Sequence, residues 1–441
     1  MLNVTTSAQS KSTEKLSSGY KINRAADDAA GLSISEKMRK QIKGLDKASS
    51  NAQDGVSAVQ TAEGALTEVH SMLQRMNELA TQAANGTNSE SDRSSIQDEI
   101  DQLTTEIDRV SETTKFNETY LLKGQSGTTN KYMAAHDAGF DGTLVDGDTK
   151  ATFTMKIKAG ESLKIGGTNY DIYATGSGVS DLQTKVGKLT ANKEVTIDGT
   201  KYTVVDKAQV DEKANKLEAS TIAAKIQAGS TVNLTPTDAS KAVKAVDTSK
   251  PTSIDVATAT QKVTAELQAA NDIGAADGKS TVTAGTAAAD GTIEFAIQKG
   301  HASVANTLSF NLHVGADADS TNKITVNIDS MSTAGLGIKG LNVKDSTGTA
   351  ATYAIDAIAD AISTVSSQRS SLGAVQNRLE HTINNLDNVS ENTTSAESRI
   401  RDTDMAKEMV NYSKNNILAQ AGQSMLAQAN QSNQGVLSLL Q

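Results

Sequence analysis

The residues with the clearest potential for chemistry are a pair of adjacent carboxylates and two glycine-rich segments. Asp27 and Asp28 carry the side chains that general acid–base catalysis uses. The segment 335–340, GLGIKG, matches the G-x-G-x-x-G pattern of dinucleotide sites, and 274–280, GAADGKS, resembles a phosphate-binding loop. Each pattern has a plainer interpretation. The aspartates precede a long predicted helix, whose dipole favours negative charge there. A strand-like segment rather than a helix follows 335–340, and 274–280 is one residue too short between its glycines. We therefore predict no nucleotide site and no catalytic constellation.

Metal and thiol chemistry have no support either. The chain has no Cys, which excludes disulfides, thiolate metal sites and a cysteine nucleophile. The five histidines contain neither an H-E-x-x-H motif nor a pair four residues apart; they are His70, His136, His301, His313 and His381. His70 and His381 lie in predicted helices, where a packing or surface role is expected. No metal and no cofactor are predicted.

The composition disfavours two further classes of protein. The 441 residues carry 42 Lys and Arg against 52 Asp and Glu, a net charge of −10, whereas nucleic-acid-binding proteins usually present a basic face. No apolar run reaches the roughly 18–20 residues of a membrane span, and the N-terminus lacks the pattern of a secretory signal. The sequence by itself therefore favours a cytoplasmic protein that binds neither nucleic acid nor membrane, unless export uses another route.

The glycines divide the chain into three parts. Of the 32 glycines, 22 lie within residues 123–345 together with both prolines, Pro236 and Pro251. We expect helical ends and a turn-rich middle.

Apolar residues seven apart mark long helices at both ends. On the N-terminal side a helix is predicted from near Asp28 to Ala84, with a stop at 85–86 and a new N-cap at Asn88 or Ser89. The second helix then runs back antiparallel to the first. The N-terminal seam consists of Val59, Leu66, Leu73 and Ala80 with Ala62, Val69, Met76 and Ala83. Narrow apolar stripes need partners, so the two chain ends should pack together.

On the C-terminal side one stripe precedes a polar segment, 390–398, which we interpret as a helix break, and another stripe follows it. The first stripe consists of Ile358, Val365, Leu372, Leu379 and Leu386. The second consists of Met405, Tyr412, Ala419 and Leu426, with Val410 and Ile417 beside it.

The middle of the chain contains a repeated strand–turn–strand pattern. Residues 163–172 and 195–204 align at an offset of 32, and each has alternating apolar positions around a Gly-Gly or Asp-Gly pair. Helical patterns near 180–189 and 208–227 follow, which indicates a duplicated ββα unit. Strands are also expected at 293–298, 305–314 and 323–329, while 232–292 gives no clear pattern. The predicted class is α+β: a long antiparallel helical coiled-coil bundle formed by both chain ends, with an inserted β-rich (ββα-type) outer domain.

Both ends of the chain resemble bacterial flagellin, the filament subunit of the rotary flagellum. The similar segments include LSSGYKINRAADDAAGLSISEKMR at 16–39, IQDEIDQLTTEIDRVSETTKFN at 96–117 and ILAQAGQSMLAQANQSNQGVLSLLQ at 417–441; the others are 51–93, 310–318 and 369–410. The resemblance implies a structural protein for motility that polymerises with copies of itself and has no enzymatic activity. It also implies secretion by type III export, an export chaperone, a filament cap and an extracellular location in the flagellar filament, which replaces the cytoplasmic expectation. The middle, about 126–304, lies outside the resemblance, in the part of the chain that this family varies.

The resemblance implies a division of the chain into five parts. They are a core helix and spoke (1–30), an N-terminal bundle segment (31–125), a variable surface insert (126–304), a β-hairpin with the C-terminal bundle segment (305–401) and a C-terminal core helix (402–441). In this family the first helix begins with further apolar residues, so we expect Met1 to lie inside it: either the native start is upstream, or the core helix is shortened.

The resemblance also implies recognition by Toll-like receptor 5. The family's receptor-contacting segment has the pattern Q-R-x-x-x-L-A with a facing I-Q-x-E-I. Arg75 is expected to donate charged hydrogen bonds, Leu79 to give an apolar contact and Glu99 to accept. The matching residues are Gln74, Arg75, Leu79, Gln82, Ile96 and Glu99. By residue type alone, this surface equally fits the solvated exterior of a coiled coil.

Three alternatives to a polymerising flagellin stay open at this stage. A hook–filament junction protein is related, although such proteins resemble flagellin less continuously in 369–410. A secreted, non-polymerising or immune-modulating flagellin would follow from a shortened first helix. An enzyme within the insert is the third, and the absence of H-E-x-x-H disfavours its metalloprotease form.

Overall fold

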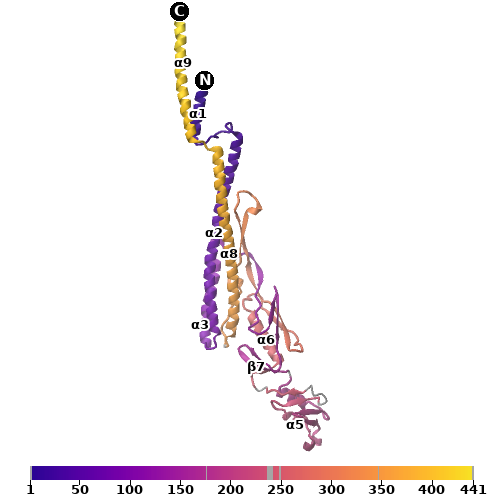
Figure 1. The fold of residues 1–441 in the computed structure, drawn as a ribbon. Helices are drawn as coiled ribbons and strands as arrows, with labels where there is room; N and C mark the ends of the chain where they lie inside the picture. Colours follow the sequence, from indigo (N-terminus) through magenta and orange to yellow (C-terminus); the bar gives the residue numbers. More distant parts are fainter. Residues whose placement is uncertain (1, 175, 236–241, 248–249, 346, 440–441) are drawn as a thin grey trace. The chain divides into compact units, whose positions relative to one another are not determined.

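The computed structural model describes all residues except 1, 175, 236–241, 248–249, 346 and 440–441 (Figure 1). The chain divides into two compact units. One unit contains residues 1–60, 309–326 and 372–441, and the other contains 61–308 and 327–371. The long helices α2 (Ala29–Ala84) and α8 (Thr349–Arg401) contribute to both units. Helical ends and an inserted, strand-rich middle confirm the predicted α+β class; the five-part division stays a prediction.

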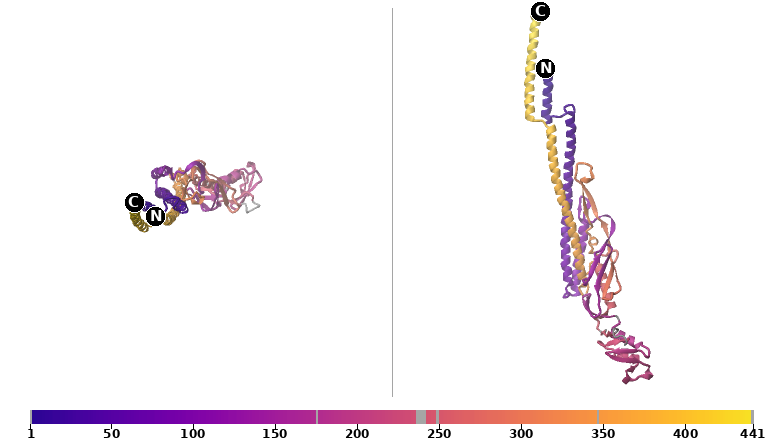
Figure 2. Two further views of the ribbon diagram at one scale, coloured as in Figure 1. Left: turned by 90° about the horizontal axis from the view of Figure 1, so that it is seen from above. Right: turned by 45° about the vertical axis from the view of Figure 1, so that its right-hand side comes forward.

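The two chain ends pair in the first unit. Helices α1 (Leu2–Ser18) and α9 (Met405–Leu439) lie side by side in the views of Figures 1 and 2. Beside them, the chain on each side forms a short antiparallel bridge: the Lys21 amide donates to the Arg401 carbonyl (2.8 Å), and the Thr403 amide donates to the Gly19 carbonyl (2.9 Å). The Arg401 guanidinium also lies 4.5 Å from the centre of the Tyr20 ring. These contacts tie together the points where α1 ends and α9 begins.

Helix α8 continues through 390–398 to Arg401, so the predicted break is wrong at that place, and the helix ends at 402–404 instead. Polar residues there bond back to their own helix: Thr393 Oγ1 donates to the Val389 carbonyl (2.7 Å), and Asn392 Nδ2 donates to the Asn388 carbonyl (2.8 Å). Short polar side chains on a solvated face weaken a helix without ending it.

A β-hairpin packs on the helices of the first unit. Its strands are β17 (Leu308–His313) and β18 (Lys323–Ile328), which confirms the strands predicted near 305–314 and at 323–329. Buried residues of α2, the hairpin and α8 form one cluster: Ala52, Val314, Ile324 and Leu379. Gly55 permits the close approach, because a Cβ at this position would collide with Leu312 of the hairpin.

In the second unit, α2 and α3 (Glu90–Thr113) form the predicted antiparallel hairpin. The whole predicted N-terminal seam from Val59 to Ala83 is buried, and so are the five residues of the first C-terminal stripe on α8. Gln97 of α3 is buried as well, where its amide donates to the Leu341 carbonyl (2.9 Å) and accepts from the Val343 amide (2.7 Å). These two hydrogen bonds therefore hold the segment around 341–343, which precedes α8, against α3.

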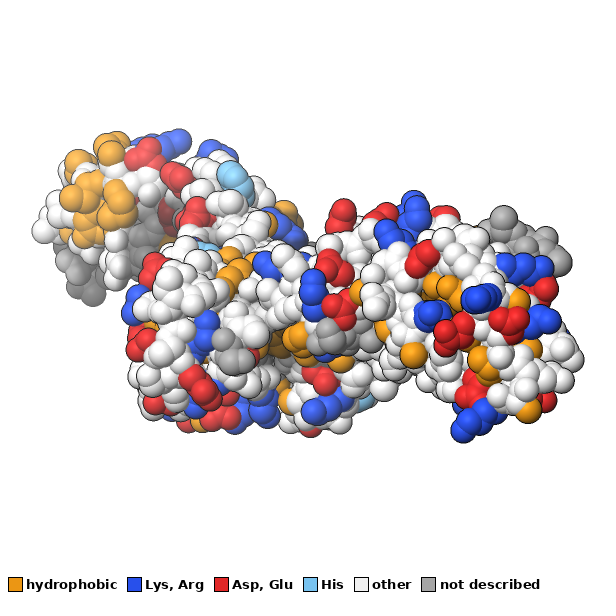
Figure 3. Space-filling view, turned by 90° about the horizontal axis from the view of Figure 1, so that it is seen from below, with side chains coloured by type: hydrophobic (Ala, Val, Ile, Leu, Met, Phe, Trp, Pro, Cys, Tyr) orange, Lys and Arg blue, Asp and Glu red, His pale blue; other side chains and the backbone are white. Residues whose placement is uncertain are grey.

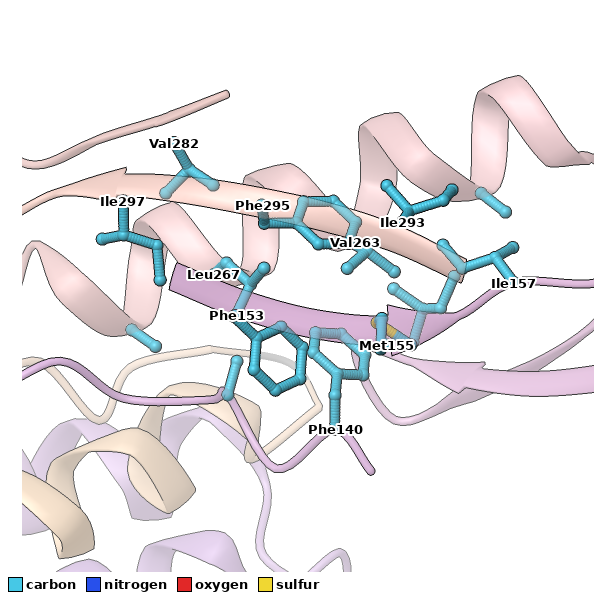
Figure 4. Close-up of a cluster of buried hydrophobic side chains, with 14 of the residues drawn as sticks. Phe140, Phe153, Met155, Ile157, Val263, Leu267, Val282, Ile293, Phe295 and Ile297 are labelled. Atoms are coloured by element: carbon cyan, nitrogen blue, oxygen red, sulfur yellow. The ribbon is translucent and has the colours of Figure 1, made fainter. Parts of the chain in front are cut away.

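The middle of the chain forms several small sheets around two cores. The larger core lies between the sheet β14-β15-β5-β4 and helix α6 (Val256–Asn271), with Phe153 and Phe295 at its centre (Figure 4). The strands are β1 (Lys115–Phe116), β2 (Thr119–Tyr120), β3 (Gln125–Tyr132), β4 (Thr143–Asp146), β5 (Lys150–Lys156), β6 (Ser162–Ile165), β7 (Thr168–Tyr173), β8 (Glu194–Ile197), β9 (Thr200–Val204), β10 (Lys216–Leu217), β11 (Thr231–Asn233), β12 (Val243–Lys244), β13 (Ser253–Asp255), β14 (Thr281–Ala284), β15 (Thr292–Gln298) and β16 (His301–Asn306). The short helices are α4 (Val179–Gly187), α5 (Ala219–Ala224) and α7 (Thr333–Leu336).

The repeated pattern is a duplication, but its two copies are nested. Hairpins β6–β7 and β8–β9 turn at 166–167 and 198–199 with positive φ at all four residues, as type I′ turns require. Each hairpin gains a parallel third strand: Ile254 of β13 pairs with Ile172, and Leu217 of β10 pairs with Val204. In each case a helix begins two residues after the paired residue: α6 follows Ile254, and α5 follows Leu217. The second copy is thus inserted between β7 and β13 of the first.

A matching pair of cation–π contacts supports the nested assignment. The Lys262 ammonium of α6 lies 5.1 Å from the Tyr170 ring centre, and the Lys225 ammonium beside α5 lies 5.8 Å from that of Tyr202.

The prediction that the helix near 180–189 completes the first copy is therefore wrong. Helix α4 forms where it was predicted, but its residues Leu182 and Val186 pack in the core of the second copy. The helix of the first copy is α6, in the stretch that gave no clear pattern, because contact with a distant hairpin rather than sequence order selects it. Of the predicted helix at 208–227, only α5 is an α-helix. The lobe of β8–β12 with α4 and α5 shows side chains of both charge signs interspersed (Figure 3, right).

Candidate functional site

The turn between α2 and α3 is held by a capping box and a buried arginine. Ser89 caps α3: the Asp92 amide donates to Ser89 Oγ (3.2 Å), and the Ser89 amide donates to the Asp92 carboxylate (2.9 Å). Arg93 is buried and donates to the carbonyls of Ala83 (2.9 Å), Asn85 (3.3 Å) and Asp345 (3.0 Å). These bonds close the C-terminal end of α2, where a positive charge also suits the helix dipole.

Arg75 forms the polar centre of the outer surface of this hairpin. Its Nε donates to Glu99 of α3 at 2.9 Å, and its Nη1 donates to Glu78 at 3.1 Å. The hydrogen bond to Glu99 is the main cause that raises the pKa of Arg75. Gln74 lies next to it, with Nε2 3.1 Å from the His70 ring nitrogen. The structure therefore brings Arg75 and Glu99, 24 residues apart, onto one exposed surface.

The six residues of the expected receptor surface do not share one environment. Gln74, Arg75, Gln82 and Glu99 are exposed. Leu79 is 2% exposed and Ile96 is 6% exposed, so both side chains are buried in the folded chain. The apolar contact expected of Leu79 is therefore not on the surface of the free chain, and these two residues hold the surface together from beneath.

The last helix has an uncovered apolar face. Val410, Ile417 and Met425 are 68%, 65% and 67% exposed. Of the predicted stripe, Ala419 is buried and Tyr412 is partly buried, which leaves the rest in solvent. The sequence reasoning missed Met409, Leu418 and Met425, although their spacing alongside Val410, Ile417 and Leu426 on the helix marks them as neighbours of the stripe. We call the exposed residues that share one side of the helix the α9 face: Met409, Val410, Ile417, Leu418 and Met425.

A shallow groove of about 600 Å³ runs along the α9 face, lined by Met409, Val410, Ile417 and Leu418 among others. Soluble monomers seldom expose contiguous apolar surface of this kind unless another molecule covers it.

The residues considered above for catalysis or nucleotide binding have structural roles. Asp28 Oδ1 accepts from the Gly31 amide (2.9 Å) at the start of α2, and Asp27 accepts from the Asn23 and Arg24 amides, which lowers the pKa of Asp27. In 335–340, α7 ends at Gly337 (φ +75°) and no helix opens at Gly340, as the sequence predicts. Among the described residues no group of His, Asp and Glu is placed to hold a metal ion, and none of the described helices is long and apolar enough to cross a membrane.

Comparisons with known proteins agree with this arrangement. Residues 1–127 match the family model of the bacterial flagellin N-terminal helical region, and 355–440 match that of the C-terminal helical region. A flagellin of Clostridium tyrobutyricum is 43% identical over 438 residues, 98% of this chain and 96% of that protein. The chain belongs to the flagellin family. A Bacillus subtilis flagellin is 38% identical (98% of this chain, 93% of that one), and polar flagellin A of Vibrio parahaemolyticus is 33% identical (100% and 95%).

The membership fixes the general role. The chain is a structural subunit of the flagellar filament, outside the cell, and is not an enzyme. These relatives also extend through 126–304, so the middle of this flagellin has counterparts that the resemblance of the two ends did not reach.

Proposed function

We propose that this flagellin assembles by covering the α9 face with other copies of the chain. The observation that carries the proposal is the exposure of five large apolar side chains on one side of α9, a helix that also packs on α1. Burial of apolar surface drives association, and a contact between two different surfaces of the same chain builds an open helix when its rotation does not close a ring.

Secretion is part of the same proposal. Export through the flagellar type III channel, with an export chaperone before it and a filament cap at the growing end, suits a chain that has no Cys and so needs no disulfide to fold outside the cell.

Assembly is tested on purified monomer. Salting-out followed by negative-stain microscopy should give filaments, and the variant Val410→Asp/Ile417→Asp should remain monomeric with unchanged helical circular dichroism. Filaments formed equally well by this variant would contradict the role of the α9 face. Failure of the wild-type chain to polymerise would favour the alternative, a non-polymerising secreted or immune-modulating flagellin.

We further propose that the free monomer is a ligand of Toll-like receptor 5. The support is the exposed cluster Gln74, Arg75, Gln82 and Glu99, in which Arg75 keeps donors beyond the two that bind Glu99 and Glu78. Leu79 and Ile96 would act by holding α2 against α3.

The receptor proposal has a matched control. Arg75→Ala should reduce signalling by monomer in receptor-expressing cells at least about tenfold, the cost of one charged hydrogen bond of about 1.5–3 kcal/mol. Arg109→Ala removes another exposed arginine that pairs with a glutamate of its own helix, Glu106, and should leave signalling unchanged. Equal signalling by wild type and Arg75→Ala would count against this surface.

A further inference from the structure

The first part of α2 presents a basic face that no contact described so far uses. At 100° per residue its four lysines fall within about 120° on the side of the helix away from the core. All four are exposed, and among the described residues none has an ion-pair partner, whereas Arg39 beside them pairs with Glu36. The basic face consists of Lys37, Lys40, Lys43 and Lys47.

Helix α3 presents the opposite charge. It holds eight acidic residues and two arginines. Neither arginine neutralises its outer side, because Arg93 is buried against carbonyl groups and Arg109 pairs with Glu106. Three exposed carboxylates lie on one side of the helix, and among the described residues their only ion-pair partner is Lys344, 4.0 Å from Asp98. The acidic face consists of Asp98, Asp101 and Glu112.

We propose that the acidic face of one copy docks on the basic face of α2 in the next copy. The occupant of each face is thus a second copy of this chain, and the inference rests on the polymerisation proposed above. The argument is charge complementarity. Each face is exposed and of one dominant sign, and apart from Lys344 at Asp98 neither has an ion-pair partner among the described residues; each has its complement elsewhere on the same molecule.

The charges also set the polarity of the assembly. A two-fold dimer through either face would place lysines against lysines or carboxylates against carboxylates, which is repulsive. Basic on acidic is a heterologous, head-to-tail contact, the kind that extends a filament in one direction. Exposed ion pairs add little affinity each but raise the rate of productive encounter, so the α9 face supplies most of the association energy and these faces select direction.

The test is seeded elongation by full-length monomer at low salt. Lys40→Glu/Lys47→Glu reverses two aligned lysines and should slow addition to wild-type seeds about tenfold. Adding Asp98→Lys/Glu112→Lys to the same chain restores complementarity, so this charge-swapped chain should elongate its own seeds but not wild-type seeds. Raising salt from about 0.02 to 0.3 M should slow wild-type elongation several-fold, because screening shortens the range of these charges.

The matched control is Lys188→Glu/Lys193→Glu, which makes the same charge change at exposed lysines outside both faces. Its elongation should equal that of wild type, and all variants should share the circular dichroism and melting temperature of the wild type.

Each failure has a distinct meaning. Normal elongation by Lys40→Glu/Lys47→Glu overturns the charged contact while leaving polymerisation intact. So does a folded charge-swapped chain that does not elongate its own seeds. Normal elongation combined with loss of binding to phosphatidylglycerol vesicles would assign the basic face to a membrane surface and overturn the inference. A wild-type chain that forms no filaments overturns the proposed function together with this contact.

Discussion

The replacement of Ile417 by alanine tests whether the α9 face is an interface or a solvated surface. Ile417 is 65% exposed in the free chain, so about two thirds of the roughly 2 kcal/mol gained by burying an isoleucine remains available to an assembly contact. Ile417→Ala should remove about 1.3 kcal/mol of that contact, which raises the monomer concentration in equilibrium with filament about tenfold. Unfolding of the monomer should change by no more than about 0.5 kcal/mol.

The assay measures residual monomer by sedimentation after complete polymerisation, and monomer stability by urea unfolding. Val145→Ala is the control, because Val145 is 64% exposed on β4, outside the α9 face, and should not alter residual monomer. An unchanged monomer concentration for Ile417→Ala would refute the reasoning. So would a large loss of monomer stability, since the side chain would then be packed within its own chain.

Three further predictions concern the stability of the monomer. Gly55→Val should lower the free energy of unfolding by about 1–3 kcal/mol by overpacking the leucine of β17, whereas Gly64→Ala, with open space around it, should raise it by about 0.5–1 kcal/mol; urea unfolding measures both. Arg93→Ala leaves carbonyl groups unpaired and should destabilise by about 2–4 kcal/mol, with faster amide hydrogen exchange in 347–350, while Arg109→Ala should change stability by less than about 1 kcal/mol. Burial raises the pKa of Asp345, but hydrogen bonds from a threonine hydroxyl and the first amides of α8 outweigh it and lower the pKa below the ordinary value of 3.8. Asp345 therefore stabilises the fold above that pH and loses its contribution as pH falls further; in Asp345→Asn this acid-side loss should shrink in pH-dependent melting, and an undiminished loss would assign it to other carboxylates.

The helical ends were predictable because their periodicity is local. Apolar residues seven apart specify a buried stripe whatever the partner, and residues such as Leu66 and Leu372 are buried as the heptads require. The Ser89 capping box follows equally from adjacent residues. The break predicted at 390–398 failed because a polar composition was taken as a stop, whereas the short polar side chains there bond back to carbonyl groups of α8 and the helix continues.

The middle was predictable only in pieces. Hairpins with Gly-Gly and Asp-Gly turns are local signals, and both form. Which helix completes which hairpin depends on contacts across more than 80 residues, and no local pattern marks α6 as the partner of β6–β7.

By itself the sequence determined the class of elements, the pairing of the chain ends and the family, because heptads, caps and long matching segments are properties of the chain. Tertiary structure alone decided which of those residues face solvent. Leu79 of α2 and Ile96 of α3 match the receptor pattern as well as Arg75 does, yet both are buried in the folded chain. Ile417 and Ala419 lie on opposite sides of α9, and only the side of Ala419 is covered by this chain. Spacing fixes which residues share a side of a helix, but which side is covered depends on the neighbours that fold against it.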